Sequence, residues 1–298
     1  MMARLRVAAA QYPPERVASP DAWRARAERW VAEAAGNGAE LLVFPEYGAM
    51  ELTATAGADG DLAAQTAALQ PLVPLVFGTF ADLARRHGVW VLAPGVPVRR
   101  PDGRLRNVSR LIAPDGRAGE QEKLVPTRFE REHWDLGGGD AVRVFGTPWG
   151  RLGVCICYDA EFPLIARAQA EAGAVLLLVP SCTDTAAGWH RVRVGAAARA
   201  LENQCFVVQS PTVGAAPWCP AIDVNVGAAA VYAPPDVGMP DDGVVAIGTM
   251  NEPGWLYADL DLAAVERVRR EGQVLNLRHW PDHARPGPAE VRELTAPI

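Results

Sequence analysis

The sequence is poor in lysine and in long apolar runs, and each shortage argues against a class of protein. One lysine, Lys123, stands among 29 basic residues, and no block of basic residues occurs in a chain whose formal net charge is −6. A mildly acidic chain of this kind argues against generic binding to nucleic acid or to an anionic membrane surface. No uninterrupted apolar run approaches the ~18 residues that a membrane-spanning helix needs. We therefore expect neither a nucleic-acid partner nor a membrane partner.

The sequence also lacks the cysteine pattern of a disulfide-stapled secreted domain. Its five cysteines are an odd number in a chain of 298 residues: Cys155, Cys157, Cys182, Cys205 and Cys219. The N-terminal apolar stretch is too short for a secretory signal. Reduced thiols and a cytoplasmic location are the expectation. No Cys or His pair has a metal-ligand spacing such as Cys-x-x-Cys or His-Glu-x-x-His, so we expect no metal.

Short apolar strands alternate with helical stretches along most of the chain. Strands are predicted at residues 5–10, 41–44, 89–93, 107–112, 142–145, 152–156, 175–179, 206–209, 228–232, 244–247 and 255–260. Helices are predicted at residues 21–35, 76–87, 164–172, 189–202 and 262–271. Residues 119–139 are predicted to be polar and irregular. No linker or repeat divides the chain, so the pattern predicts one α/β domain with sheet inside and helices outside.

Reactive side chains follow three of the predicted strands. Glu46 comes directly after residues 41–44 and a proline, Cys157 after residues 152–156, and a polar Ser-Cys-Thr-Asp run after the strand that starts at Val175. In α/β sheets, ligands bind outside the carboxyl ends of the strands. We therefore expect these side chains to share one pocket.

Cys157 lies where a strand gives way to a turn and then a helix. Free backbone N–H groups and the positive end of a helix stabilise a thiolate at such a place. A free cysteine is as often a small core residue, so both interpretations stay open from position alone. Cys155 and Cys205 lie on apolar strands and are predicted to be core residues.

A nucleophilic cysteine needs a base and a group that stabilises an oxyanion. Glu46 is the better base candidate, because a carboxylate after an apolar strand is costly to bury without a partner; the alternative is a turn carboxylate. The central histidines, His133 and His190, do not follow strands, so a Cys/His pair is unsupported. Lys123 suits a site that needs a compact ammonium, and its alternative is a solvated lysine in a loop.

Three motifs are similar to those of the nitrilase superfamily of carbon–nitrogen hydrolases. They are F-P-E at 44–46, E-K-L at 122–124 with a proline following, and C-Y-D-x-x-F-P at 157–163. Similar segments at 107–116, 198–204 and 255–261 extend the resemblance over nearly the whole chain. Residues 161–163, 182–185 and 191–193 resemble a bacterial amidohydrolase-like branch. Some members of that branch carry an added acetyltransferase domain, for which we expect no room in this chain.

The resemblance implies a four-layer αββα sandwich over residues 1–280, with a tail at 281–298 that packs on the surface or on a partner subunit. It implies a Glu-Lys-Cys triad at Glu46, Lys123 and Cys157, no cofactor, and a homodimer or higher homo-oligomer. Glu46 would act as the base and Cys157 as the nucleophile. Lys123 and the backbone N–H of Tyr158 would hold the oxyanion.

Many members of the superfamily use a second glutamate after the lysine, and two candidates stand here. The aromatic residue four positions later and the glycine seven positions later, Trp134 and Gly137, fit Glu130. Glu130 is therefore predicted to position the substrate and the lysine, and Glu132 to be a surface charge.

Substrate contacts are predicted at the expected edge of the pocket. Ser181, Cys182 and Thr183 follow a strand there, and Arg191 or Arg193 is a candidate for binding a substrate carboxylate. Arginines on a helix are as often solvated or paired, so that alternative stays open. Related sequences often have a serine near residues 227–230, where this chain has alanines. This departure concerns the polarity of the pocket and not the triad.

The leading prediction is a hydrolase that cleaves the non-peptide C–N bond of a small linear amide through a Cys thioester and releases ammonia or an amine. A carbamoyl-amide hydrolase or a nitrilase would use the same triad, and a transferase would pass the acyl group to an amine. A binding protein on this fold is the alternative outside the enzymes. The complete triad argues against it, because a binding module does not need all three residues.

Overall fold

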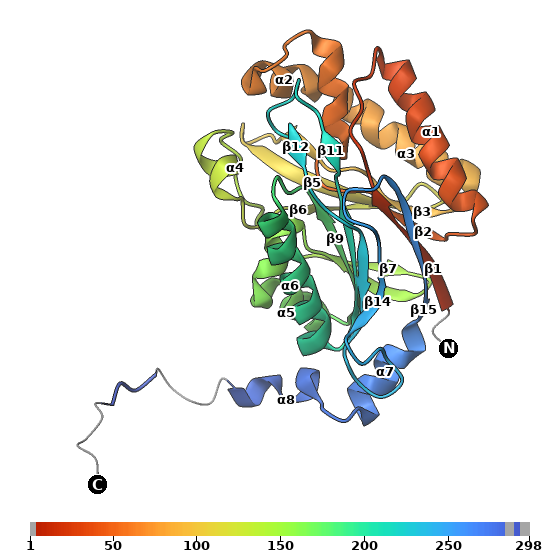
Figure 1. The fold of residues 1–298 in the computed structure, drawn as a ribbon, viewed down its shortest axis with the longest axis vertical. Coiled ribbons are helices and arrows are strands. Elements are labelled where there is room, and N and C mark those ends of the chain that lie inside the picture. Colours follow the sequence, from red (N-terminus) through yellow and green to blue (C-terminus); the bar gives the residue numbers. More distant parts are fainter. Residues whose placement is uncertain (1–3, 284–288, 293–298) are drawn as a thin grey trace.

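Two β-sheets lie face to face at the centre of the molecule, and helices cover their outer faces (Figure 1). The structure is a computed structural model, and it describes residues 4–283 and 289–292. The predicted four-layer αββα sandwich is confirmed. The predicted domain boundary at residue 280 falls inside the last helix, α8 (Asn276–His283), and part of the predicted tail lies outside the described residues.

The first sheet has three parallel strands at its centre and antiparallel strands on both sides. Its strands are, in spatial order, β15 (Gly254–Asp261), β1 (Arg4–Gln11), β2 (Leu41–Val43), β3 (Trp90–Leu92), β5 (Leu105–Ile112) and β4 (Val96–Arg99), and β6 (Ala118–Glu122) also pairs with β5. The predicted strands of this sheet are confirmed.

The second sheet also has a parallel centre. Its strands are, in spatial order, β14 (Val244–Ile247), β13 (Ala230–Tyr232), β10 (Phe206–Pro211), β9 (Ala174–Ser181), β8 (Gly150–Val154) and β7 (Val144–Thr147). Every residue of β9 is buried, as expected for a strand covered on both faces. The short strands β11 (Gly214–Ala215) and β12 (Val224–Asn225) pair separately.

Helices pack on the outer face of each sheet. The first sheet is covered by α1 (Pro20–Gly36) and α3 (Val73–His87), and the second by α5 (Pro163–Glu171) and α6 (Ala186–Asn203). The helix α2 (Leu62–Leu69) packs on the helical segments that flank it in the chain. The N-cap of α1 is Ser19, whose hydroxyl accepts a hydrogen bond from Ala22 N at 3.1 Å. The remaining helical segments are η1 (Gly48–Ala56), η2 (Gln70–Leu72), α4 (Arg128–Glu132), η3 (Cys157–Glu161) and α7 (Leu262–Glu271).

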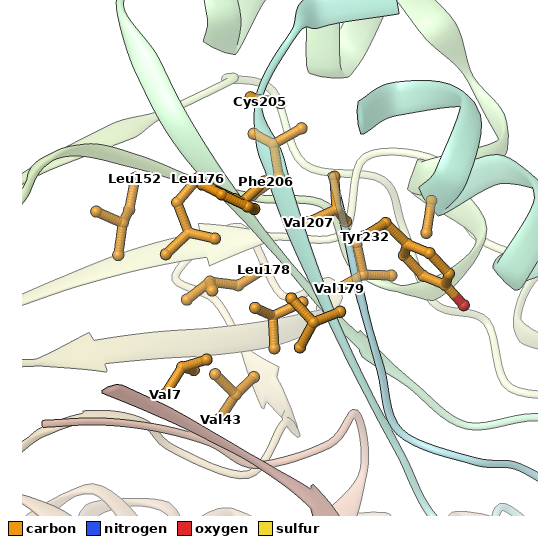
Figure 2. Packing of buried hydrophobic residues seen from close by; sticks show 14 of the residues in the cluster. Val7, Val43, Leu152, Leu176, Leu178, Val179, Cys205, Phe206, Val207 and Tyr232 are labelled. Carbon is orange, nitrogen blue, oxygen red and sulfur yellow. The ribbon is translucent and has the colours of Figure 1, made fainter. Parts of the chain in front are cut away.

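The main core lies between the two sheets (Figure 2). Val7 and Val43 of the first sheet belong to the same apolar cluster as Leu152, Leu176 and Leu178 of the second sheet. A second apolar cluster fills the space between the first sheet and the helices α1 and α3. Cys155 and Cys205 are buried core residues, as predicted. The first cluster packs the two sheets against each other, and the second packs the helices on the first sheet.

Residues 119–139 are more regular than predicted. They contain the end of β6 and the short helix α4. The polar strand β6 forms because it pairs with β5, and because Glu120 forms ion pairs with Arg100 and Arg110. The sequence of β6 alone has little preference for a strand, so tertiary pairing decides its structure. The segments η1, α2 and β4 were also not predicted.

One stretch of the described residues, Leu62–His87, has the length and apolar composition that a membrane-crossing helix needs. In the fold this stretch comprises α2, η2 and α3. Val76 and Phe80 lie in the apolar cluster that joins these helices to the first sheet. Part of its apolar character therefore serves the packing of α3 on the sheet.

Candidate active site

Glu46 lies just beyond the carboxyl end of β2 and is buried. Its Oε1 atom accepts hydrogen bonds from Asn107 Nδ2 at 2.7 Å and from Lys123 Nζ at 2.7 Å. Its Oε2 atom accepts one from the backbone N–H of Cys182 at 3.0 Å. Gly95 packs so closely that a Cβ atom there would lie 3.2 Å from Glu46 Cα. The carboxylate is thus held by groups from both sheets.

Lys123 follows β6, and its side chain is also buried. The ammonium lies 2.7 Å from Glu46 Oε1 and 2.8 Å from Glu130 Oε2. The backbone on either side is fixed, because Lys123 N donates to Asn107 O at 2.9 Å and Lys123 O accepts from Gly139 N at 2.8 Å. One ammonium therefore bridges two buried carboxylates.

Glu130 lies in α4, where it takes part in a capping box. Its Oε2 atom accepts from Thr127 N at 2.6 Å, and Glu130 N donates to Thr127 Oγ1 at 3.3 Å. The hydroxyl of Tyr47 donates to Glu130 Oε1, and the Tyr47 ring lies 4.9 Å from the Trp134 ring. The choice of Glu130 over Glu132 agrees with this geometry, since Glu132 is exposed and pairs with Arg128 at 2.8 Å.

Cys157 begins η3, the turn after β8. Its φ of +50° is uncommon for a residue other than glycine, and such strain is often found at functional sites. The Cys157 Sγ atom lies 3.7 Å from the carbonyl oxygen of Cys182. Tyr158 is in the first turn of η3, where a helix offers no acceptor for the backbone N–H. The predicted role of this N–H in holding an oxyanion stays a prediction.

A cavity of about 640 Å³ brings the predicted residues together. Its lining includes the triad candidates, Glu130 and Tyr158, and it also includes Cys182, Thr183 and Arg191. Thr183 Oγ1 donates to Val226 O at 2.8 Å. The Arg191 side chain is 63% exposed, and its Nε lies 3.7 Å from Glu161 Oε1. The cavity wall therefore carries one guanidinium that is only loosely paired.

Ser181 and Arg193, two of the candidates for substrate contact, are not among the residues that line the cavity. Ser181 is the last residue of β9, and its side chain is buried below the cavity, 3.5 Å from Ser210 O. Arg193 does not line the cavity, because its position on α6 directs it to Trp189, whose ring centroid lies 5.9 Å from the guanidinium carbon. The alanines at 228–230 do not line the cavity either. The missing serine therefore does not change the polarity of this cavity.

No histidine lines the cavity, in agreement with the weak case for a Cys/His pair. His133 packs against the Phe129 ring at a tilt, and His190 meets the Trp189 ring edge to face. Within residues 4–283 and 289–292, no group of three His, Cys, Asp or Glu side chains is arranged to hold a metal ion.

Comparison with known proteins identifies the family. A sequence profile described as carbon–nitrogen hydrolase matches residues 6–270. The chain belongs to the carbon–nitrogen hydrolase family. It is 32% identical over 277 residues to the probable hydrolase YhcX of Bacillus subtilis (strain 168). The aligned region covers 92% of this chain and 53% of YhcX. The chain thus spans about half the length of this curated relative.

Solved structures of the nitrilase superfamily share the fold. Nit3 of Saccharomyces cerevisiae, a member of branch 10 of that superfamily, superposes with a TM-score of 0.71 and 22% identity, over 90% of this chain and 93% of Nit3. A double mutant of the amidase from Nesterenkonia sp. AN1 in complex with acrylamide gives a TM-score of 0.69 and 23% identity, over 90% of this chain and 94% of the amidase.

The charges of this carbon–nitrogen hydrolase's site are strongly coupled. Burial raises the pKa of Glu46 to about 7, against the opposing effect of Lys123. Burial and then the Glu46 carboxylate raise the pKa of the Cys157 thiol well above its usual value. Burial opposes the charge of Lys123, but Glu130 and Glu46 hold its pKa well above the usual value. The resting site therefore holds a neutral thiol, an ammonium and a carboxyl group that titrates near neutral pH.

Glu130 differs from Glu46 in its charge state. Burial alone would raise the pKa of Glu130, but the Lys123 ammonium and the hydrogen bonds from Tyr47 and Thr127 hold it below the usual value. Two buried carboxyl groups beside one ammonium are thus distinguished by their environments, and only Glu46 is poised to gain and lose a proton near pH 7.

Sequence reasoning missed three polar residues of the site in this carbon–nitrogen hydrolase. Asn107 was predicted only as part of a strand, yet it donates to Glu46. Tyr47 was not singled out, yet it binds Glu130 and has a φ of +57°. Asp159 belongs to the C-Y-D motif, and its sequence position alone does not reveal its contacts with Leu124 and Val125. The Thr-x-x-Glu spacing from Thr127 to Glu130 was a signal that would have located α4 and its buried carboxylate.

Proposed function

We propose that this carbon–nitrogen hydrolase cleaves a small linear amide through a thioester on Cys157 and releases ammonia or an amine. The observation that carries the proposal is the 2.7 Å contact between Lys123 Nζ and Glu46 Oε1 in a cavity that also holds the Cys157 thiol. Burying an ammonium between two carboxylates is costly, and a binding protein gains nothing from that arrangement. The arrangement is useful to an enzyme that must move a proton and stabilise an oxyanion.

The first step joins proton transfer to nucleophilic attack. The Glu46 carboxylate takes the thiol proton while the sulfur of Cys157 bonds to the amide carbonyl carbon. The carbonyl oxygen becomes an oxyanion, which the Lys123 ammonium and the Tyr158 N–H hold. A preorganised donor of this kind contributes about 3–4 kcal/mol to the transition state in comparable sites.

The second step breaks the C–N bond. Glu46 returns its proton to the nitrogen, ammonia or an amine leaves, and a thioester remains on Cys157. Water then attacks the thioester carbonyl while Glu46 accepts the proton of that water. The C–S bond then breaks, Glu46 returns the proton to the sulfur, and the carboxylic acid product leaves with the thiol restored. Throughout, Glu130 keeps the ammonium in place through its contact of 2.8 Å with Lys123 Nζ.

An amide is the favoured substrate class because of both the site and its relatives. The Nesterenkonia amidase, which shares the fold, binds acrylamide in its crystal structure. The cavity of about 640 Å³ has a size typical of small-molecule sites. We propose that Cys182, Thr183 and Arg191 contact the part of the substrate that lies away from the scissile bond.

A screen for ammonia release over amides, nitriles and carbamoyl amino acids tests the proposal. We expect release from an amide by the wild-type chain and none by Cys157→Ala. Cys155→Ala is the matched control, because Cys155 is a buried thiol outside the cavity. Intact-mass measurement during turnover should find the acyl group on the wild-type chain. Hydrolysis that persists in Cys157→Ala, or a wild-type chain inactive on all amides, would contradict the proposal.

A further inference from the structure

Asp159 connects the backbone that carries Lys123 to the turn that carries Cys157. We propose that Asp159 is a positioning residue that sets the place of the Lys123 ammonium relative to the Cys157 sulfur. The inference rests on the proposed roles of Lys123 and Cys157. It goes beyond them, because Asp159 is fully buried and does not line the cavity.

The Asp159 carboxylate accepts hydrogen bonds from three backbone N–H groups. Its Oδ1 atom accepts from Val125 N at 2.8 Å and from Leu124 N at 3.1 Å. Its Oδ2 atom accepts from Ile156 N at 3.2 Å and lies 3.1 Å from Leu124 N. Leu124 and Val125 are the two residues after Lys123, and Ile156 is the residue before Cys157. The carboxylate therefore binds the immediate chain neighbours of both groups.

These hydrogen bonds cross the boundary between the two sheets. Lys123 follows a strand of the first sheet, and Cys157 follows a strand of the second sheet. Apolar side chains form most of the contact between the sheets, and apolar packing has no preferred direction. Hydrogen bonds do have a preferred direction and distance. Asp159 therefore adds a directional link between the two sheets at the point where the chain carries Lys123 and Cys157.

The choice of a carboxylate fits this role. Both oxygens of a carboxylate accept hydrogen bonds, whereas an amide offers one acceptor oxygen and an NH₂ donor. In Asp159→Asn, the NH₂ group would face a backbone N–H, either on the lysine side or at Ile156. Burial raises the pKa of Asp159 to about 6, and the backbone N–H groups oppose this effect. Among the described residues, backbone N–H groups hold this buried carboxylate, and the Lys123 ammonium also lowers its pKa.

The test compares Asp159→Asn with Glu51→Gln in the full chain. Glu51 is the control: it is a fully buried carboxylate outside the cavity that accepts a backbone N–H from Glu15 at 3.0 Å and also pairs with Arg26 at 3.3 Å. The readouts are the melting temperature, the rate of Cys157 alkylation by iodoacetamide, and kcat and KM on whichever amide the screen identifies. Alkylation needs no known substrate. It depends on Lys123, because burial and the Glu46 carboxylate raise the pKa of the thiol and the Lys123 ammonium opposes that rise.

We expect Asp159→Asn to lower kcat and the alkylation rate at least about tenfold, with KM within about threefold of the wild-type value, since small misplacements at a reacting centre are costly. Glu51→Gln should lower the melting temperature without changing either rate. If Asp159→Asn does not fold, Asp159→Glu replaces it, which keeps the charge and moves the acceptors. An alkylation rate within twofold of wild type in a folded variant, or an equal loss in Glu51→Gln, would overturn the inference. Failure of the proposed function is separate, because it appears as an inactive wild-type chain.

Discussion

The titratable residues of the site differ in their protonation states. The raised pKa of Glu46 predicts how the rate of amide hydrolysis depends on pH. Because burial raises the pKa of Glu46 to about 7, the group is a carboxylate above that pH and a neutral acid below it. A base must be deprotonated to accept the thiol proton. We therefore expect kcat/KM to fall about tenfold per pH unit below pH 7 and to level off above it. Rates of amide hydrolysis from pH 5 to 9 measure this dependence.

The same titration should be visible without substrate. The rate of Cys157 alkylation by iodoacetamide should have an acidic limb near pH 7 in the wild-type chain, and Glu46→Gln should lose that limb. Glu51→Gln controls for the removal of another buried carboxyl group, whose pKa burial also raises to about 7. An acidic limb at the ordinary carboxyl value, near pH 4.5, would contradict the assignment of Glu46 as the base.

Substitutions of Arg191 and Arg193 test the proposed substrate contact. The two residues are two positions apart on α6 but have different surroundings. Arg191 lines the cavity and is paired only loosely with Glu161, whereas Arg193 lies over Trp189. For an amide that carries a carboxylate, Arg191→Ala should raise KM up to about fivefold with kcat unchanged, as expected for an exposed charge pair. Arg193→Ala should change neither, and a KM unaffected by Arg191→Ala would reject the contact.

At the scale of helices and strands, periodic patterns predicted the elements that pack on the core, and tertiary contacts decided the others. Residues 7–10 and 175–179 are apolar and buried, so their own sequence predicts strands. Residues 118–122 form β6 only because β5 pairs with them.

The residues of the site divide in the same way into those that the sequence locates and those that only the fold reveals. Glu46 and Cys157 follow apolar strands and could be located from the sequence. Asn107 looks like any polar residue of a strand until the fold places it 2.7 Å from Glu46.

The packing of α6 on the turn of Cys157 depends on a glycine. A Cβ atom at Gly195 would lie 2.7 Å from the carbonyl oxygen of Ala160, a backbone atom of η3. Gly195→Ala should therefore move α6 or the turn and lower the free energy of unfolding by about 1–3 kcal/mol. It should also lower kcat, because the turn carries Cys157. Urea denaturation and amide hydrolysis measure the two effects.

The control for this glycine lies in another helix. Gly78 in α3 has no atom within 4 Å of the Cβ position, so Gly78→Ala meets no clash. It should raise the free energy of unfolding by about 0.5–1 kcal/mol, because alanine favours a helix more than glycine does. If both variants gained stability, the close contact between α6 and η3 would not constrain the turn.

At the scale of the whole molecule, the site depends on both sheets at once. Glu46 and Lys123 follow strands of the first sheet, and Cys157 and Cys182 follow strands of the second. Two sets of hydrogen bonds join the sheets close to the reacting groups. Cys182 N donates to Glu46 Oε2, and the backbone N–H groups of Leu124 and Val125 donate to Asp159. Any change that slides one sheet over the other should therefore disturb proton transfer and oxyanion binding together.

The outer face of the second sheet's helices is where we expect a second copy of the chain to bind. Leu164 of α5 and Val194 and Leu201 of α6 are 71%, 63% and 42% exposed. Val194 and Leu201 are seven positions apart, so they lie on one face of α6, and α5 packs beside that helix (Figure 1). Large apolar side chains gathered on an outer face are typical of an interface.

Light scattering after size exclusion measures the association. The wild-type chain should elute at about twice 31.9 kDa or a higher multiple, and Val194→Asp combined with Leu201→Asp should elute as the 31.9 kDa monomer, because each aspartate would be buried without a partner in the dimer. Val237→Asp is the control, since Val237 is 64% exposed in a loop and should leave the mass unchanged. A monomeric wild-type chain at all concentrations would reject the dimer. A double variant that stays dimeric would place the interface elsewhere.

Because α6 also packs against the turn of Cys157, the monomeric variant should in addition show a lower kcat. Such a loss would link assembly to the site through one helix.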